Sequence, residues 1–390
     1  IISTVGSKVS FLALPLVATV TLQATPLQMG YLSAIGSLPG LLLGLFAGVW
    51  IDREKRRPLL IAADIGRGLL LLVIPLAAYF GFLNMPLLYG VIFLTGTLGL
   101  LFSISSYLPS LVPRAQLVEA NSKLAVSSSA AEIAGPTLGG WLVQTLGAPI
   151  AMGFDAISFL LSALCLGLIR KPEPMPKPLE TQTGVWREIG EGLHLILHQP
   201  TLRALTMSIS TVSFFNATLE AVYLLYMTRN LNLAPSLIGL IFGAGSVGFL
   251  LGALLPAYLT LRVSLGGTII SGLFLTAASD FILPLAVGPQ LVIVALLISG
   301  QICFGLGLTL FNVGQMSLRQ AVTPDELQGR MNSTINVAVG GAILLGALMG
   351  GGLGERIGLR PTLLVAASGE LLSVLWLIFS PVRTLYQPPT

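Results

Sequence analysis

The nonapeptide Arg170-Lys-Pro-Glu-Pro-Met-Pro-Lys-Pro178 opens the only long polar stretch of the sequence, which runs to Pro200. Its alternating prolines favour an extended backbone. On both sides of this stretch the chain consists of long apolar runs. We therefore predict a linker, residues 170–200, between two parts of similar length, residues 1–169 and 201–390.

The second part of this linker carries apolar residues at helical spacing, with charged residues between them. That pattern predicts a short amphipathic helix lying on a membrane surface. The apolar residues are Val185, Trp186, Ile189, Leu193, Ile196 and Leu197.

The composition excludes a soluble globular domain. Only 9% of the 390 residues are charged and 54% are hydrophobic, with a mean hydropathy of +0.89. A soluble domain carries about a quarter charged residues, because water must hydrate its surface. Long apolar runs indicate that this surface faces a lipid bilayer instead. The two cysteines, Cys165 and Cys303, lie in apolar runs and offer neither a disulfide framework nor a metal cluster.

Charge, proline and glycine clusters divide the apolar sequence into segments of about 20 residues, the length that crosses a bilayer as a helix. We predict an all-α polytopic membrane protein with twelve transmembrane helices, six on each side of the linker. The expected spans are 1–22, 27–51, 58–80, 86–111, 119–145, 149–169, 201–228, 235–261, 265–287, 290–318, 329–353 and 361–380.

The distribution of Lys and Arg predicts the orientation, since cytoplasmic loops carry an excess of both. With the N-terminus in the cytoplasm, 16 of the 20 basic residues fall on the cytoplasmic face and three on the other, while Lys8 lies within the first span. Both termini are therefore expected in the cytoplasm. The sequence begins inside an apolar run, so we expect the natural N-terminus to precede Ile1, and we find no cleavable signal peptide.

The two halves repeat each other at an offset of about 210 residues. Such duplicated bundles are related by a pseudo-two-fold axis along the membrane normal, and solute binds between them near the midplane while rocking alternates access. Chance similarity of glycine-rich helices is the alternative. The matching positions are Asn121-Ser122, Gly135-Pro136 and Gly139-Gly140 in the first half, and Asn332-Ser333, Gly346 and Gly350-Gly351 in the second.

The stretch that begins Gly48-Val-Trp-Ile follows the second span and resembles the loop between helices 2 and 3 of the major facilitator superfamily, G-x-L-a-D-R-x-G-R-R. Trp50 and Lys55 depart from that pattern. The resemblance implies a cluster that latches the two halves on the cytoplasmic side in the outward-facing state. A simple positive-inside anchor is the alternative. The matching residues are Gly48, Asp52, Arg53, Arg56 and Arg57.

Two residues of the next span extend this cluster. Asp64 and Arg67 lie three positions apart, so one helical face presents both. The corresponding stretch of the second half, Gly252 to Arg262, lacks the Asp, and a latch would therefore be one-sided.

The fifth span contains Ala131-Glu-Ile-Ala-Gly135-Pro136-Thr-Leu-Gly139-Gly140, which resembles the motif G-x-x-x-G-P-x-x-G-G of drug and proton antiporters. Small residues four apart allow close helix packing, and the proline kinks the helix. The resemblance implies a hinge that favours export, and ordinary close packing is the alternative. Segments 108–121 and 323–333 are further similar to the branch that contains macrolide-efflux proteins, enterobactin exporters and lysophospholipid transporters.

Ionisable residues inside the membrane are candidate sites, because burying an unpaired charge is costly. The superfamily resemblance implies that helices 1, 4, 7 and 10 line the cavity, which ranks Lys8 and Glu220 first and Glu132 second. Asp155, Asp280 and Glu370 are expected to be packing partners or to lie near the interface.

Glu220 lies on one helical face with Asn216 and Tyr223, at i−4 and i+3. We hypothesise that its carboxyl binds a proton or a cationic substrate group, and that Lys8 or another polar group tunes its pKa. A fixed ion pair between the halves is the alternative.

Neutral polar and aromatic residues of helices 2, 4, 7, 10 and 11 are expected to fill out the cavity and predict an amphipathic substrate rather than a sugar, although an aromatic stripe also serves packing. The polar candidates are Tyr31, Ser37, Ser103, Tyr107, Gln301, Asn312, Gln315 and Asn336, and the aromatic ones are Phe214, Phe215, Phe304 and Phe311.

Catalytic and nucleotide-binding motifs are missing from the sequence. It has no phosphate-binding G-x-x-x-x-G-K-S/T loop, and its two histidines both lie in the linker. We expect no enzyme activity, no cofactor and no nucleic-acid partner, and a proton gradient as energy source. The sequence thus predicts a monomeric, proton-coupled exporter of amphipathic compounds in the inner membrane of a prokaryote. A lysophospholipid flippase and a non-transporting receptor or scaffold are the alternatives.

Overall fold

The computed structural model describes residues 2–51, 56–104, 116–169, 185–255 and 264–385. Within them lie twelve helices of 15 residues or more. They are α1 (Ile2–Leu16), α2 (Pro26–Ile51), α3 (Arg56–Tyr79), α4 (Met85–Ile104), α6 (Leu117–Leu146), α7 (Ala148–Leu168), α9 (Pro200–Leu225), α10 (Pro235–Leu254), α12 (Leu265–Ser279), α14 (Gln290–Val322), α15 (Gln328–Ile357) and α16 (Leu359–Ile378).

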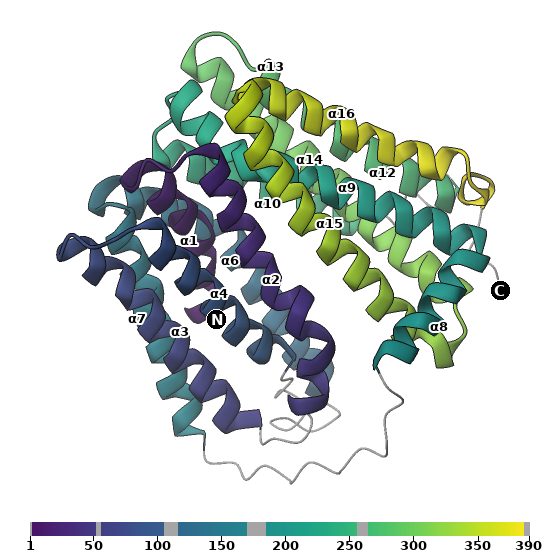
Figure 1. Ribbon diagram of the computed structural model, residues 1–390, viewed down its shortest axis with the longest axis horizontal. Coiled ribbons are helices and arrows are strands. Elements are labelled where there is room, and N and C mark those ends of the chain that lie inside the picture. The colour runs from purple at the N-terminus through teal and green to yellow at the C-terminus, as the bar shows by residue number, and fades with distance from the viewer. Residues whose placement is uncertain (1, 52–55, 105–115, 170–184, 256–263, 386–390) are drawn as a thin grey trace. The chain divides into compact units, whose positions relative to one another are not determined.

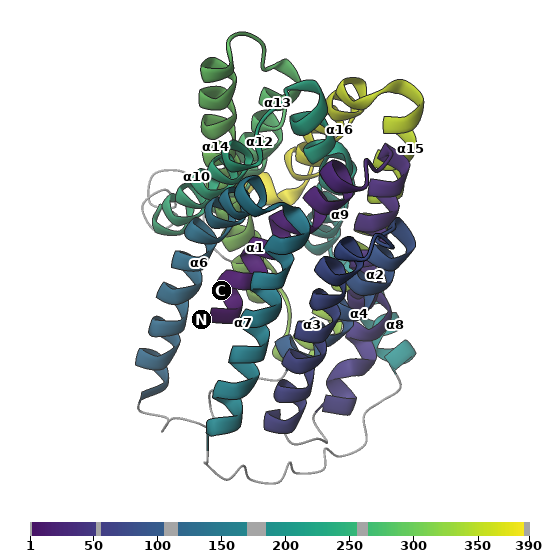
Figure 2. The same ribbon diagram turned by 90° about the vertical axis from the view of Figure 1, so that its left-hand side faces the viewer.

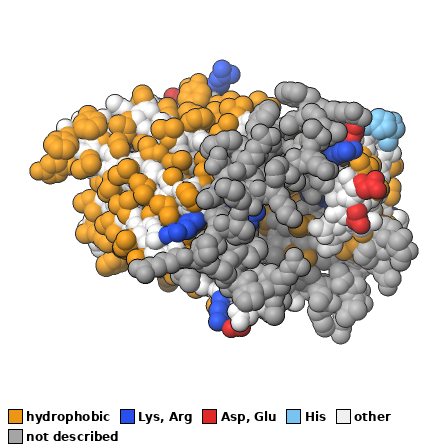
Figure 3. Space-filling view, turned by 90° about the horizontal axis from the view of Figure 1, so that it is seen from below, with side chains coloured by type: hydrophobic (Ala, Val, Ile, Leu, Met, Phe, Trp, Pro, Cys, Tyr) orange, Lys and Arg blue, Asp and Glu red, His pale blue; other side chains and the backbone are white. Residues whose placement is uncertain are grey.

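These helices confirm the predicted all-α membrane fold with twelve long helices (Figure 1). Over the described residues, nine helices are long and apolar enough to cross a membrane. Large apolar side chains such as Leu69, Leu164 and Leu291 are exposed on their outer faces. Hydrophobic side chains also cover much of the described surface in Figure 3. Because water would not tolerate so much exposed apolar area, lipid must cover these faces.

The chain divides into two compact units. Unit 1 comprises residues 1–181 and 227–243, and unit 2 comprises residues 182–226 and 244–390. The start of the second half, including the first turns of α10, thus groups with the first half. The division therefore does not follow the linker alone.

In unit 1, α7 packs against both α3 and α1, α1 also packs against α6, and α4 lies between α2 and α3 (Figure 2). Small residues permit these approaches. A Cβ atom added at Gly6 of α1 would overlap the side chains of Asp155 and Ser158 on α7. Gly6 therefore allows α1 to lie directly on the acidic part of α7.

In unit 2, α9 lies between α15 and α16, and α12 packs against α14. Gly346 and Gly350 of α15 touch the backbone of α9, where an added Cβ would overlap the Phe214 and Thr218 carbonyl groups. The Thr218 hydroxyl donates a hydrogen bond to the Gly346 carbonyl at 3.0 Å. Two helices in such close contact form a rigid support for the side chains that α9 carries.

The backbone repeats between the halves in detail. Both α1 and α9 end in a π-helical turn, η1 (Val17–Thr21) and η3 (Tyr226–Asn230). The Ala24 amide donates to the Ala18 carbonyl at 2.9 Å, and 209 positions later the Leu233 amide donates to the Met227 carbonyl at 3.0 Å. This local agreement supports a duplicated six-helix unit.

The joint between the last two helices repeats as well. Gly147, between α6 and α7, has a φ of +89°, and Gly358, between α15 and α16, has a φ of +87°. Only glycine adopts such angles without strain. The same tight turn therefore joins the fifth and sixth helices of each half.

The predicted linker helix is α8 (Val185–His198). Its Ile196 is buried with Leu202 of α9 and with Met331 and Ile335 of α15. An ion pair between Glu191 and Arg330 joins α8 to α15. Within unit 2 this helix thus packs on α15 and α9, while the two histidines of α8 are at an edge of the view in Figure 3.

Candidate functional site

Two buried carboxyl groups meet inside unit 2. Asp280 follows the last residue of α12, and Glu370 lies in the middle of α16. Their side chains are within hydrogen-bonding reach of each other, and the Asn216 amide of α9 lies beside Glu370. Glu370 is 0% exposed and Asp280 is 7% exposed. We call Asp280 and Glu370 the carboxyl pair.

The surrounding helices hold the carboxyl pair firmly. Next to Glu370, the backbone of Gly369 lies against the ring of Phe215, where an added Cβ would overlap the ring. The Ser373 hydroxyl donates to the Glu370 carbonyl at 2.5 Å, and the Ser208 hydroxyl of α9 donates to the Ser373 carbonyl at 3.0 Å. This part of α16 is therefore fixed on α9, with the Glu370 side chain fully buried.

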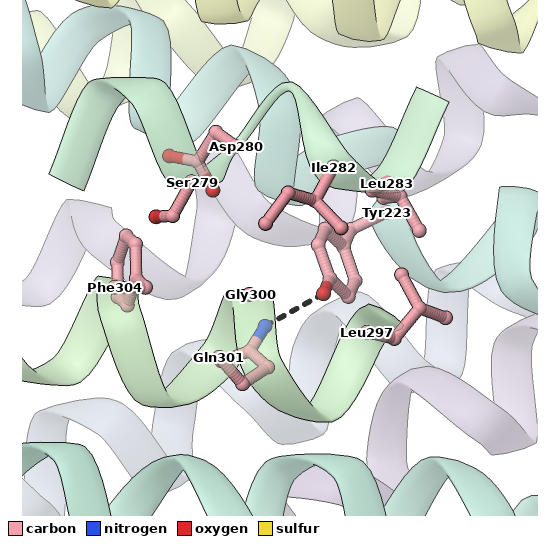
Figure 4. Close-up of a pocket in the computed structure, with 9 residues that line it drawn as sticks. All are labelled: Tyr223, Ser279, Asp280, Ile282, Leu283, Leu297, Gly300, Gln301 and Phe304. Carbon is pink, nitrogen blue, oxygen red and sulfur yellow. Dashed lines mark hydrogen bonds between the residues drawn. The ribbon is translucent and has the colours of Figure 1, made fainter. Parts of the chain in front are cut away.

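A small cavity opens on one side of the carboxyl pair (Figure 4). It is lined by Asp280 together with Tyr223 of α9 and Gln301 of α14, and its interior measures about 10 Å³. The Gln301 amide donates a hydrogen bond of 2.6 Å to the Tyr223 hydroxyl. An interior of about 10 Å³ holds at most about one water molecule, so this cavity suits water or a proton pathway and is too small for a drug.

Glu220, the first-ranked candidate, is exposed on α9. It lies one turn beyond Asn216, and Asp280 is close enough to feel its charge. The predicted stripe of Asn216, Glu220 and Tyr223 therefore borders the carboxyl pair. The side chains of the stripe lie in different surroundings, because Tyr223 is 7% exposed and Asn216 is half-buried.

The other unit 2 candidates lie further along α14. Gln315 is buried and accepts a hydrogen bond of 3.2 Å from Arg319, whereas Asn312 is exposed. Phe311 is 1% exposed and packs in a hydrophobic cluster with Ile269 and Leu273 of α12. Phe311 is thus a core residue of this unit. Tyr107 lies outside the described residues.

Lys8 and Glu132 pair with each other in unit 1. The Lys8 Nζ lies 2.5 Å from the Glu132 carboxylate, and their side chains are 32% and 48% exposed. This partly hydrated ion pair links α1 to α6. The structure therefore gives Lys8 a carboxylate partner within its own unit.

The glycine motif of α6 faces two helices. A Cβ added at Gly135 would overlap the Lys8 side chain of α1, and one at Gly139 would lie 3.1 Å from the Val9 backbone. Gly140 instead faces α10, where an added Cβ would overlap the Pro235 carbonyl oxygen and lie 2.9 Å from Gly239. The Pro136 carbonyl also touches Gly239. The motif thus packs α6 simultaneously on α1 and on the first turns of α10.

The candidate latch is described only in part. Asp52 and Arg53 lie outside the described residues, Gly48 lies in α2, and Arg56 begins α3. The Arg57 guanidinium donates to the carbonyls of Leu166 and Gly167 at 3.1 and 2.7 Å. Arg57 therefore caps the C-terminal end of α7, where a cation is favoured by the helix dipole.

Asp64 and Arg67 belong to a buried acidic cluster with Asp155 of α7. The Arg67 guanidinium interacts with both carboxylates and lies 4.0 Å from the centre of the Phe159 ring. The Asp155 carboxylate also accepts a hydrogen bond of 3.0 Å from the Ser158 hydroxyl. Asp64 and Asp155 are 0% and 1% exposed, and Arg67, within electrostatic range of both, offsets part of the cost of burying them.

The sequence placed Asp280 and Glu370 among packing residues and gave no indication that they meet. They lie 90 positions apart in different helices. One signal was available: each is an acidic residue in an apolar helix without a basic residue within four positions. Only the contact between α12 and α16 brings them together.

The family model described as "transmembrane secretion effector" matches residues 1–387. The uncharacterized MFS-type transporter YfiS of Bacillus subtilis is 28% identical over 97% of this chain and 89% of its own length. The multidrug efflux pump Tap of Mycolicibacterium fortuitum is 26% identical over 91% of this chain and 87% of that protein. Macrolide efflux protein A of Streptococcus pyogenes is 23% identical over 86% and 83%.

Among solved structures, the chain is similar to a bacterial homologue of the iron transporter ferroportin in its inward-facing state. The TM-score is 0.76 with 20% identity, over 96% of both chains. At this identity the likeness concerns the fold alone. Over the described residues, no group of three or more His, Cys, Asp or Glu is arranged to hold a metal ion.

Proposed function

Because the chain belongs to the transmembrane secretion effector family of the major facilitator superfamily, we propose that it exports amphipathic small molecules in exchange for protons. The similarity to efflux proteins confirms the predicted superfamily and branch. Transport and the membrane location follow from the family, whereas substrate class and proton coupling are part of the proposal. The observation that carries proton coupling is the exposed carboxyl of Glu220 on a membrane-spanning helix, next to the carboxyl pair.

Alternating access supplies the mechanism in this proposal. Glu220 takes up a proton when it is open to one side of the membrane and releases it on the other, while substrate moves in the opposite direction. The glycine motif of α6, which packs closely on α1 and on the first turns of α10, acts as the hinge of export. A monomer in the inner membrane of a prokaryote, with cytoplasmic termini, completes the proposal.

The test is transport in proteoliposomes with an imposed pH gradient. A panel of cationic drugs, siderophores and lysolipids is measured with the wild type, Glu220→Gln and Glu326→Gln. Glu326 is an exposed acidic residue of the same unit and provides the matched control. We expect gradient-driven accumulation of at least one amphipathic compound by wild type and control, and its loss in Glu220→Gln.

Two outcomes would overturn the proposal. Full gradient-driven transport by Glu220→Gln would exclude Glu220 as the proton carrier. Movement of lysolipid alone, independent of the pH gradient, would support the lipid-flipping alternative. Reporter fusions at both termini, read in intact cells, separately test the proposed cytoplasmic location of the chain ends.

A further inference from the structure

The carboxyl pair of Asp280 and Glu370 has no basic partner in the part of unit 2 that the structure describes. Asn216, Glu220 and Tyr223 face the pair from α9, and Gln301 faces the adjoining cavity from α14. None of these side chains is a cation. Arg360, the basic residue of α16, donates to the Pro284 carbonyl at 2.8 Å and lies ten positions, or about 15 Å of helix, before Glu370. Within the described residues of unit 2, no cation therefore neutralises the charge of the pair.

In the described part of the chain the oxygens of the pair also lack donors in hydrogen-bonding geometry, although the Asn216 amide lies beside Glu370. Both carboxyl oxygens of Glu370 and Oδ2 of Asp280 are buried without a hydrogen-bond partner. A carboxylate can only accept, so two ionised carboxylates side by side cannot bond to each other. One added proton changes this, because the protonated carboxyl then donates to its ionised neighbour and satisfies an oxygen on each side.

The cost of burying charge also favours one proton bound to the pair. Removing one ionised carboxylate from water costs several kcal/mol, and a second negative charge beside it adds repulsion. The rigid contact of α16 with α9 prevents the Glu370 side chain from escaping to water. Uptake of a single proton from solvent relieves both costs and requires no other species.

We propose that Asp280 and Glu370 form a proton-binding site that holds one proton between the two carboxyl groups, and that Glu220 delivers this proton through the cavity lined by Tyr223 and Gln301. Glu220 is exposed, Asp280 lies within range of its charge, and Asp280 lines the cavity (Figure 4). The proton thus passes from water to Glu220, then to Asp280, and rests between Asp280 and Glu370. The binding site stands on its own geometry, and only its use in transport rests on the proposed function.

Infrared spectroscopy of the purified protein tests the site directly, because a protonated carboxyl group has a carbonyl stretch separate from that of a carboxylate. Spectra are recorded over a pH series in nanodiscs without substrate, in choline chloride and again in sodium chloride. We expect a wild-type band that shifts in D₂O, disappears at alkaline pH and is absent from Asp280→Asn/Glu370→Gln. The matched control Asp325→Asn/Glu326→Gln, two exposed residues of the same unit, keeps the band.

The single variant Asp280→Asn is measured as well, so that the test does not depend on the folding of the double variant. Glu370 then faces an amide instead of a second acid, so its band should vanish at a lower pH than in the wild type. The proposal is overturned if the wild type has no such band, if the band survives in the double variant, or if Asp280→Asn leaves its titration unchanged. It is also overturned if sodium removes the band at constant pH, because the pair would then bind a metal cation.

The infrared spectrum and the transport assay test the two proposals independently. The band is measured in resting protein, so it stands even if no compound of the panel is transported. Gradient-driven export by a protein that lacks the band would keep the proposed function and remove the proton site. Glu220→Gln should retain the band but reach equilibrium with a pH jump more slowly, because it loses the delivery step and keeps the binding step.

Discussion

Both units bury a pair of acidic side chains, but among the described residues only the pair of unit 1 has an arginine within electrostatic range of both acids. In unit 1, Arg67 interacts with Asp64 and Asp155. In the described part of unit 2, Asp280 and Glu370 meet with only neutral and acidic side chains around them. The first cluster can stay ionised and hold helices together, whereas the second needs a proton. Burial alone therefore does not mark a functional carboxylate, and the presence or absence of a counter-ion separates the two cases.

The largest expected effect comes from removing the cation of unit 1. Arg67→Met leaves two buried carboxylates unpaired and should destabilise the protein by about 3–5 kcal/mol, read as a lower melting temperature in detergent. Arg319→Met is the control, because this half-buried Arg of unit 2 bonds only to the neutral side chains of Gln315 and Asn332. Equal losses in both variants would mean that Arg67 does not balance the acids.

Amide substitutions should act differently in the two clusters. Asp155→Asn removes a counter-charge of Arg67 and should cost about 1–3 kcal/mol. Glu370→Gln replaces the proton held by the pair with an amide N–H that donates to Asp280, so the melting temperature should stay constant or rise. A loss in Glu370→Gln as large as that in Asp155→Asn would contradict the distinction between the clusters.

Tyr223→Phe is expected to have a smaller effect, confined to proton movement. The variant loses the hydroxyl that accepts from Gln301, a bond worth about 1 kcal/mol. The infrared band of the carboxyl pair should remain, while gradient-driven transport should slow. Tyr226→Phe, a buried tyrosine three positions further on, serves as the control. A change of the band in Tyr223→Phe would indicate that the phenol belongs to the binding site itself.

The ion pair between Lys8 and Glu132 should contribute least, because both side chains are partly exposed and water screens their attraction. A double-mutant cycle of Lys8→Met and Glu132→Gln should give a coupling below about 1 kcal/mol. A coupling as large as the effect of Arg67→Met would place this pair with the buried clusters.

The sequence predicted the fold almost completely, because each span is a local property of some 20 apolar residues. The ends of the spans, however, depend on more than the local sequence. The ninth span was expected as one helix over 265–287, but α12 stops at Ser279 and a short helix, α13 (Ile282–Leu285), follows Asp280. The break brings Asp280 to the cavity, and the apolar sequence around it gives no sign of this.

The sequence could group candidate site residues only where they lie on one helix. Asn216, Glu220 and Tyr223 share a face by spacing alone, so the sequence could group them. The meeting of Asp280 with Glu370 depends on how α12 and α16 pack, which helical periodicity does not determine. Arg67 illustrates the same limit, since its spacing from Asp64 was visible while its contact with Asp155 was not.

The paired π-helical turns η1 and η3 bear on the origin of the two halves. A π-helical turn accommodates one residue more than an α-helical turn, and it arises most simply by a one-residue insertion into an existing helix. Both turns occur 209 positions apart and end in the same backbone bond, so a single insertion in an ancestral six-helix gene, copied when that gene doubled, explains both. The same irregular turn thus ends the first helix of each half, as a duplicated unit requires.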